Sequence, residues 1–108
     1  MPKRARSGRI EWEAIVRFYE QLVRISPTLG TQTGYAAAMA EAHGPYSGLS
    51  ILDAIDSDAI SAYQPYWAVR AHLLQRLEKT PEALEAYNRA IGLAEDPAVR
   101  EFLLRRRG

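Results

Sequence analysis

Apolar side chains at helical spacing dominate this sequence. In the first such segment Trp12, Ile15, Val16, Tyr19 and Leu22 recur every three or four residues, which is the rhythm of one face of an α-helix. Later segments keep the same rhythm, and no convincing stretch alternates apolar and polar residues as a half-buried strand does. The chain is therefore predicted to be all-α.

Proline and glycine mark where these helices stop and start. Ser26-Pro27 and Gly44-Pro45 interrupt the pattern, while Thr80-Pro81 and Asp96-Pro97 each offer a capping side chain followed by proline at the first helical position. A connection near 57–64 has room for one turn of its own. The sequence predicts about six helices, over residues 10–26, 32–43, 46–56, 65–77, 81–94 and 98–106.

The odd-numbered helices share a spacing. Ile15, Tyr19 and Leu22 precede Gly48, Leu52 and Ile55 by 33 residues, and those precede Ala83, Tyr87 and Ala90 by 35. Helical pairs that repeat at this period are typical of an α-solenoid of tetratricopeptide type. The final unit, with Trp67 and Ala71 before Ala83, Tyr87 and Ala90, fits that pattern best. The prediction is a tetratricopeptide-like solenoid of antiparallel helices, and the alternative is a plain helical bundle.

Charge is distributed unevenly along the 108 residues. Seven of the fourteen cations lie in 1–9 and 105–107, while residues 10–104 carry seven cations against thirteen acids. Between Arg24 and Arg70 there is no cation at all. We therefore expect a basic tail at 1–9, a single domain at 10–107 and a mildly acidic middle. Direct DNA binding by the folded part is not expected, because phosphate affinity requires cations gathered on an ordered surface.

The sequence offers little for catalysis or metal binding. There is no cysteine, and the two histidines, His43 and His72, are far apart and lack a carboxylate or second histidine at helical spacing. No known catalytic or phosphate-binding motif is present. We expect no enzyme activity, no metal and no cofactor. No apolar run is long enough to span a bilayer, so no membrane contact and a cytoplasmic location are expected.

Two segments of the sequence resemble a known family of helical domains. They are GPYSGLSILDAI and AYQPYWAVRAHLLQRLEKTPEALEAYNRAIGLAEDPAVREFLLRR, preceded by EWEAIVRFYEQLVRISPT. Together they resemble the C-terminal helical domain of bacterial extracytoplasmic-function RNA polymerase sigma factors that carry tetratricopeptide-like repeats. Members of that group have an Asn-Arg pair in the second helix, where this chain has Gly34-Tyr35. The promoter-melting and helix-turn-helix regions of a full sigma factor have no counterpart here, so the chain alone is not expected to initiate transcription.

The resemblance implies a non-catalytic regulatory domain that contacts sigma regions, polymerase or another regulator. A repeat scaffold offers a concave surface to such a partner. Candidate partner-binding residues lie on the first helix of the final unit and in the acidic middle: Tyr63, Tyr66, Ala68, His72, Gln75, Glu41, Asp53, Asp56 and Asp58. The acidic residues would face a basic partner. The alternatives are a free-standing helical-repeat adaptor, or weak nucleic-acid binding through the basic termini.

Overall fold

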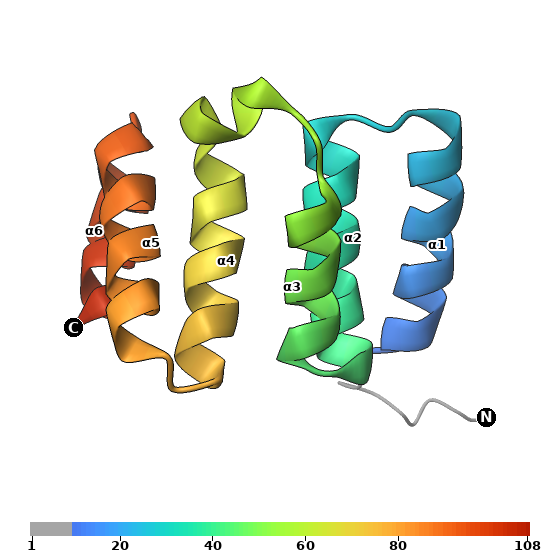
Figure 1. Cartoon of the computed structure of the whole chain (residues 1–108), viewed down its shortest axis with the longest axis horizontal. Helices are drawn as coiled ribbons and strands as arrows, with labels where there is room; N and C mark the ends of the chain where they lie inside the picture. Colours follow the sequence, from blue (N-terminus) through green and yellow to red (C-terminus); the bar gives the residue numbers. More distant parts are fainter. Residues whose placement is uncertain (1–9) are drawn as a thin grey trace.

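The computed structural model describes residues 10–108, so the predicted basic tail at 1–9 lies outside the described residues. Residues 10–108 form six α-helices and one 3₁₀ turn, with no strand among them, and the all-α prediction is confirmed (Figure 1). The elements in chain order are α1 (Trp12–Ile25), α2 (Leu29–His43), α3 (Pro45–Ala54), η2 (Asp58–Ala62), α4 (Gln64–Arg76), α5 (Thr80–Leu93) and α6 (Pro97–Arg107).

The second helix begins three residues earlier than the sequence predicts, and its start explains why. The Thr28 hydroxyl accepts from the Thr31 amide at 3.1 Å, and the Thr31 hydroxyl accepts from the Thr28 amide at 3.0 Å. This reciprocal capping box satisfies two amides that a helix start leaves without partners. The stretch from Thr28 to Thr31 resembles a loop in sequence, but it is the first turn of α2.

Two of the predicted helix ends differ from the structure, and one is confirmed. The start of α5 is Thr80 itself, with Lys79 at the N-cap and no side-chain cap, so the prediction that Thr80 caps this helix was wrong. By contrast, Asp96 caps α6 through a hydrogen bond from the Ala98 amide at 2.9 Å, as predicted. Helix α6 spans Pro97–Arg107, one residue more at each end than the predicted helix over 98–106, and it includes all three C-terminal arginines.

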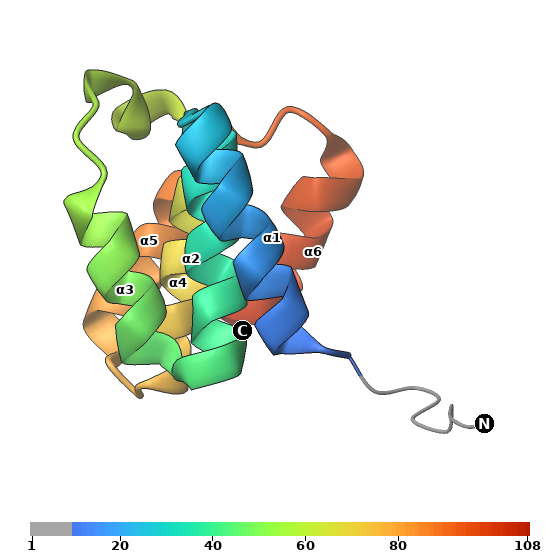
Figure 2. The ribbon, with the colours of Figure 1, turned by 90° about the vertical axis from the view of Figure 1, so that its right-hand side faces the viewer.

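Successive helices lie side by side and run in alternating directions (Figure 1). The most extensive contacts join α4 to α5, α2 to α3 and α1 to α2, whereas α6 packs on α5. Helix α2 also contacts α4, which is two helices further along the chain. In Figure 2, α1 lies nearest the viewer with α6 behind it on the right, and α2 and α4 lie to its left, between it and α3.

Gly48 allows three helices to meet closely. A β-carbon on this residue would stand 2.7 Å from the carbonyl oxygen of Ala36 and 2.7 Å from a methyl carbon of Leu73. It would also lie 2.8 Å from the β-carbon of Ala40. Because α2, α3 and α4 all contribute atoms at this point, the absence of a side chain at Gly48 sets their separation.

The core consists of a few large side chains surrounded by alanines. Leu52 and Leu73 are fully buried, and Tyr66 and Tyr87 fill the space between helices. Small residues on the facing helices allow the backbones to approach closely. The buried alanines are Ala36, Ala38, Ala40, Ala71, Ala83, Ala86, Ala90 and Ala94.

Trp67 packs against this core, and it also ties the η2 turn to α4. Its indole nitrogen donates to the carbonyl of Ile60 at 3.0 Å. The Arg89 guanidinium lies over the ring, 4.2 Å from its centroid, which adds a cation–π contact from α5. Trp67 therefore joins α4 to both the η2 turn and α5.

Candidate functional site

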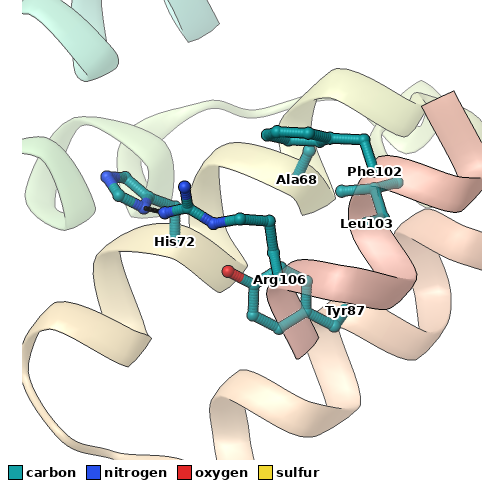
Figure 3. A pocket seen from close by; sticks show the side chains of 6 residues that line it. All are labelled: Ala68, His72, Tyr87, Phe102, Leu103 and Arg106. Atoms are coloured by element: carbon teal, nitrogen blue, oxygen red, sulfur yellow. Dashed lines mark hydrogen bonds between the residues drawn. The ribbon is translucent and has the colours of Figure 1, made fainter. Parts of the chain in front are cut away.

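Two adjoining hollows lie on either side of α4. The first, of about 260 Å³, is enclosed by α4, α5 and α6 and lined by Ala68, His72, Tyr87, Phe102, Leu103 and Arg106 (Figure 3). The second, of about 300 Å³, shares Ala68 and His72 and adds Trp12, Ala37, Glu41, Val69 and Leu73 from α1, α2 and α4. We call the combined surface the α4 groove.

The groove has an apolar floor and an aromatic side chain on each wall. Ala68 and Val69 of α4 form part of the floor, together with Ala37 of α2. Trp12 stands at the start of α1 on one side. On the other side Phe102 extends from α6 toward Ala68 (Figure 3), and 51% of Phe102 is exposed to solvent. An aromatic ring held open in this way is typical of a surface that contacts another molecule.

Arg106 carries the charge of the first hollow. A guanidinium nitrogen lies 3.3 Å from Nδ1 of His72 (Figure 3). Burial lowers the pKa of His72, the nearby charges of Arg106 and Arg76 lower it further, and Glu41 acts in the opposite direction. A neutral imidazole can accept a hydrogen bond from Arg106 but cannot compensate its charge.

The acidic residue of the second hollow is already paired. Glu41 of α2 accepts from Arg76 of α4 at 3.3 Å. Nearby, at the end of α2, His43 lies 3.2 Å from the carboxylate of Glu13 on α1. The groove therefore contains Glu41, which is paired with Arg76. It also contains Arg106, which forms no ion pair with any of residues 10–108.

Gln75 links the three helices that form the first hollow. Its side-chain oxygen accepts from the Tyr87 hydroxyl at 2.9 Å, and its nitrogen donates to the Arg106 carbonyl at 3.0 Å. These bonds fix the end of α6 against α4 and α5. Gln75, predicted as a partner contact, thus has a role in holding the wall of the groove.

The structure brings together three of the predicted partner-binding residues, Glu41, Ala68 and His72, which all line the α4 groove. Tyr66 does not belong to this surface, because it is 6% exposed and packs edge-on against Trp67 in the core. Tyr63 is half-buried before α4, with its hydroxyl over Gly30 of α2. Tyr66 therefore faces inward, and Tyr63 is partly covered where the chain enters α4.

Two of the four predicted acidic contacts are paired within the domain. Asp53 of α3 is ion-paired with Arg70 of α4 at 2.8 Å, just as Glu41 is paired with Arg76. Asp56 and Asp58 are exposed and lie in the connection around η2. The acidic middle is therefore partly compensated, because α4 brings its cations against a stretch of sequence that has none.

Sequence reasoning missed Trp12, Phe102 and Arg106 as neighbours of one surface. Trp12 was assigned to the packing face of its helix, and Arg106 was placed at the end of the last predicted helix with no neighbour assigned to it. The three residues come from the first and last helices, so their proximity to α4 depends on the stacking of all six helices. A helical spacing alone does not report such long-range proximity.

The groove is small, and its lining is mostly apolar. Among the residues described, no three histidine or acidic side chains are grouped so that they could hold a metal ion. Each hollow is at or below the lower end of the range for small-molecule sites, which is roughly 300 Å³. Within residues 10–108 no helix is both long and apolar enough to cross a membrane. The geometry is that of a shallow apolar surface.

Comparisons with known proteins yield one relative. An uncharacterised protein of Rhizobium meliloti is 29% identical to this chain over 98 residues, which cover 91% of this chain and 23% of the relative. The chain thus spans about a quarter of the length of that protein. No profile of a known protein family matches the chain, and no solved structure is significantly similar to it.

Proposed function

We propose that the six helices form a short solenoid of tetratricopeptide type. Two observations support this arrangement. The residues that share the repeat spacing are buried in α3 and α5, whereas their counterparts in α1 are only half-buried, as expected for the end of a stack. Helix α2 also contacts α4, which fits successive helical pairs that stack on one another. In this solenoid α2, α4 and α6 line the concave side.

We infer that the domain is a non-catalytic protein-interaction module and that the α4 groove is its binding surface. The observation that carries this inference is the pair of adjoining apolar hollows along Ala68 and His72, with Trp12 and Phe102 on opposite walls. Apolar surface that remains open in a folded domain is stabilised when a partner covers it, and aromatic residues contribute most of the binding energy at such contacts.

The partner is proposed from the resemblance to the C-terminal domain of extracytoplasmic-function sigma factors. In this role the domain contacts sigma regions, RNA polymerase or another regulator, and it modulates transcription initiation in the bacterial cytoplasm. The relative in Rhizobium meliloti offers a parallel, because there the matching segment is part of a much longer chain. A domain of this kind acts on other regions of its own chain or on a separate protein through the same groove.

Binding to purified transcription proteins tests this proposal. The domain is titrated against core RNA polymerase and against the promoter-binding regions of an extracytoplasmic-function sigma factor, and binding is measured by calorimetry. We expect saturable binding to at least one of them. Ala68→Trp, which fills the groove, should abolish that binding.

The matched control is Ala54→Trp, which places the same ring on the exposed end of α3. Circular dichroism establishes that both variants remain helical. Absence of binding by the folded wild-type domain would contradict the role in transcription, and equal loss in both variants would show that the groove is not the contact surface.

A further inference from the structure

The charge in the α4 groove is unbalanced at one position. Glu41 is paired with Arg76, and burial together with the charges of Arg106 and Arg76 lowers the pKa of His72. Within residues 10–108 the Arg106 guanidinium has one side-chain hydrogen-bond partner, the His72 ring at 3.3 Å, and it lies 5.7 Å from the centroid of the Phe102 ring. Arg106 is exposed at the edge of the apolar hollow, where its guanidinium can form two parallel hydrogen bonds with a carboxylate.

The apolar floor favours a ligand whose backbone amides and carbonyls are hydrogen-bonded to each other. Side chains line both hollows, and residues 10–108 contain no strand edge to which an extended peptide could add. A helix satisfies its amides and carbonyls internally and presents apolar side chains at intervals of three or four residues. The two hollows, side by side across α4, offer space for successive side chains of this kind.

We propose that the α4 groove binds an amphipathic helix of a partner protein, with apolar side chains in the two hollows and an aspartate or glutamate of that helix on Arg106. The inference rests on the proposed interaction function and specifies the chemistry of the partner. The carboxylate binds beside α6, and the apolar stripe lies over Ala68 between Trp12 and Phe102.

Charge complementarity distinguishes this ligand from other occupants. The N-terminal segment of this chain carries Lys3, Arg4, Arg6 and Arg9 with no acid, so its charge has the same sign as that of Arg106. A nucleic acid would bring phosphates to a surface that is mostly apolar, whereas phosphate binding requires several cations together. An acidic amphipathic helix matches both the apolar floor and the single cation.

A selection from displayed peptides tests the proposal without knowledge of the partner. The library consists of helical peptides about 18 residues long, which is five turns, with all surface positions varied. Sequences that bind the wild-type domain should carry an apolar stripe at helical spacing together with an aspartate or glutamate at a fixed position. Enrichment of extended or basic sequences would overturn the proposal, as would enrichment no greater than that on beads without the domain.

Variants of the domain then test the assigned position of the carboxylate. Arg106→Gln should weaken binding of the selected peptide by about fivefold. This loss of affinity should disappear when the acidic residue of the peptide is changed to its amide. Arg105→Gln is the matched control, because Arg105 is an exposed arginine of the same helix outside the groove. Equal effects of the two variants, or an effect of Arg106→Gln that persists with the amide peptide, would refute the contact.

The peptide assay and the binding assay with transcription proteins test the two proposals separately. If acidic helical peptides bind the groove but polymerase and sigma regions do not bind the domain, the role in transcription is wrong and the ligand chemistry stands. If those proteins bind equally well to wild type, Ala68→Trp and Arg106→Gln, the interaction function stands and the proposed groove ligand is wrong.

Discussion

Replacing Gly48 by alanine should destabilise the domain, although alanine is the better helix former. In an open helix the substitution would stabilise by about 0.8–1 kcal/mol. At Gly48 the new methyl group would stand 2.7 Å from a carbonyl oxygen of α2 and 2.7 Å from Leu73. Overpacking of a core costs about 1–3 kcal/mol, and the upper end applies here because a helix backbone cannot rotate away as a side chain can. The net loss should be about 2 kcal/mol.

Urea unfolding followed by circular dichroism measures this loss, provided that the slope of the transition is unchanged. The matched control is Gly92→Ala in α5, where an added β-carbon meets no atom within 4 Å. That variant should be stabilised by about 0.5–1 kcal/mol. If Gly48→Ala is as stable as wild type while Gly92→Ala behaves as expected, the three helices are not packed as closely as the argument requires.

Three further predictions concern single side chains. Thr33 is 4% exposed, and its hydroxyl has no hydrogen-bond partner among the described residues. Thr33→Val should therefore stabilise the domain by about 1 kcal/mol in urea unfolding, and a loss of stability would show that the hydroxyl is hydrogen-bonded. Asp96→Ala removes the cap on α6 and should cost about 1 kcal/mol, seen as faster hydrogen exchange in α6 but not after Glu95→Ala. His72 has a pKa below its ordinary value of 6.5, so the unfolded chain binds its proton first and stability should fall as pH decreases from 7 through 6.5 to the folded pKa. His72→Gln should lessen that fall, and an identical pH profile would contradict it.

The helices themselves could be predicted because their signals are local. The spacing of Trp12, Val16 and Tyr19 reports one face of a helix, and Asp96-Pro97 reports a start, since both depend only on residues a turn apart. The beginning of α2 was missed because a capping box of two threonines is a weaker signal than serine or threonine followed by glutamate. The start of α5 was misplaced by one residue, because Thr80 begins the helix rather than capping it, and this error also concerns a local signal.

The candidate site was only partly predictable. Ala68 and His72 were selected because they lie on the side of their helix away from the core, and the structure places both in the groove. Tyr66 was misassigned, because an amphipathic segment that includes an aromatic residue does not reveal which ring turns inward. Phe102 is a large apolar residue next to Glu101 in the last helix, but the residues beside it in the sequence do not report that it lies close to α4.

Local patterns in the chain were enough to predict an all-α protein, the approximate bounds of its helices and the small residues that let them pack closely. These properties follow from interactions between residues a few positions apart. Which charges meet and which surface stays open became visible in the packed arrangement of the helices. Arg70 and Arg76 neutralise acids 17 and 35 residues away, and the groove depends on Trp12 and Phe102 at opposite ends of the chain. Such contacts depend on the stacking of all the helices, because long-range proximity is fixed by packing rather than by any local pattern of residues.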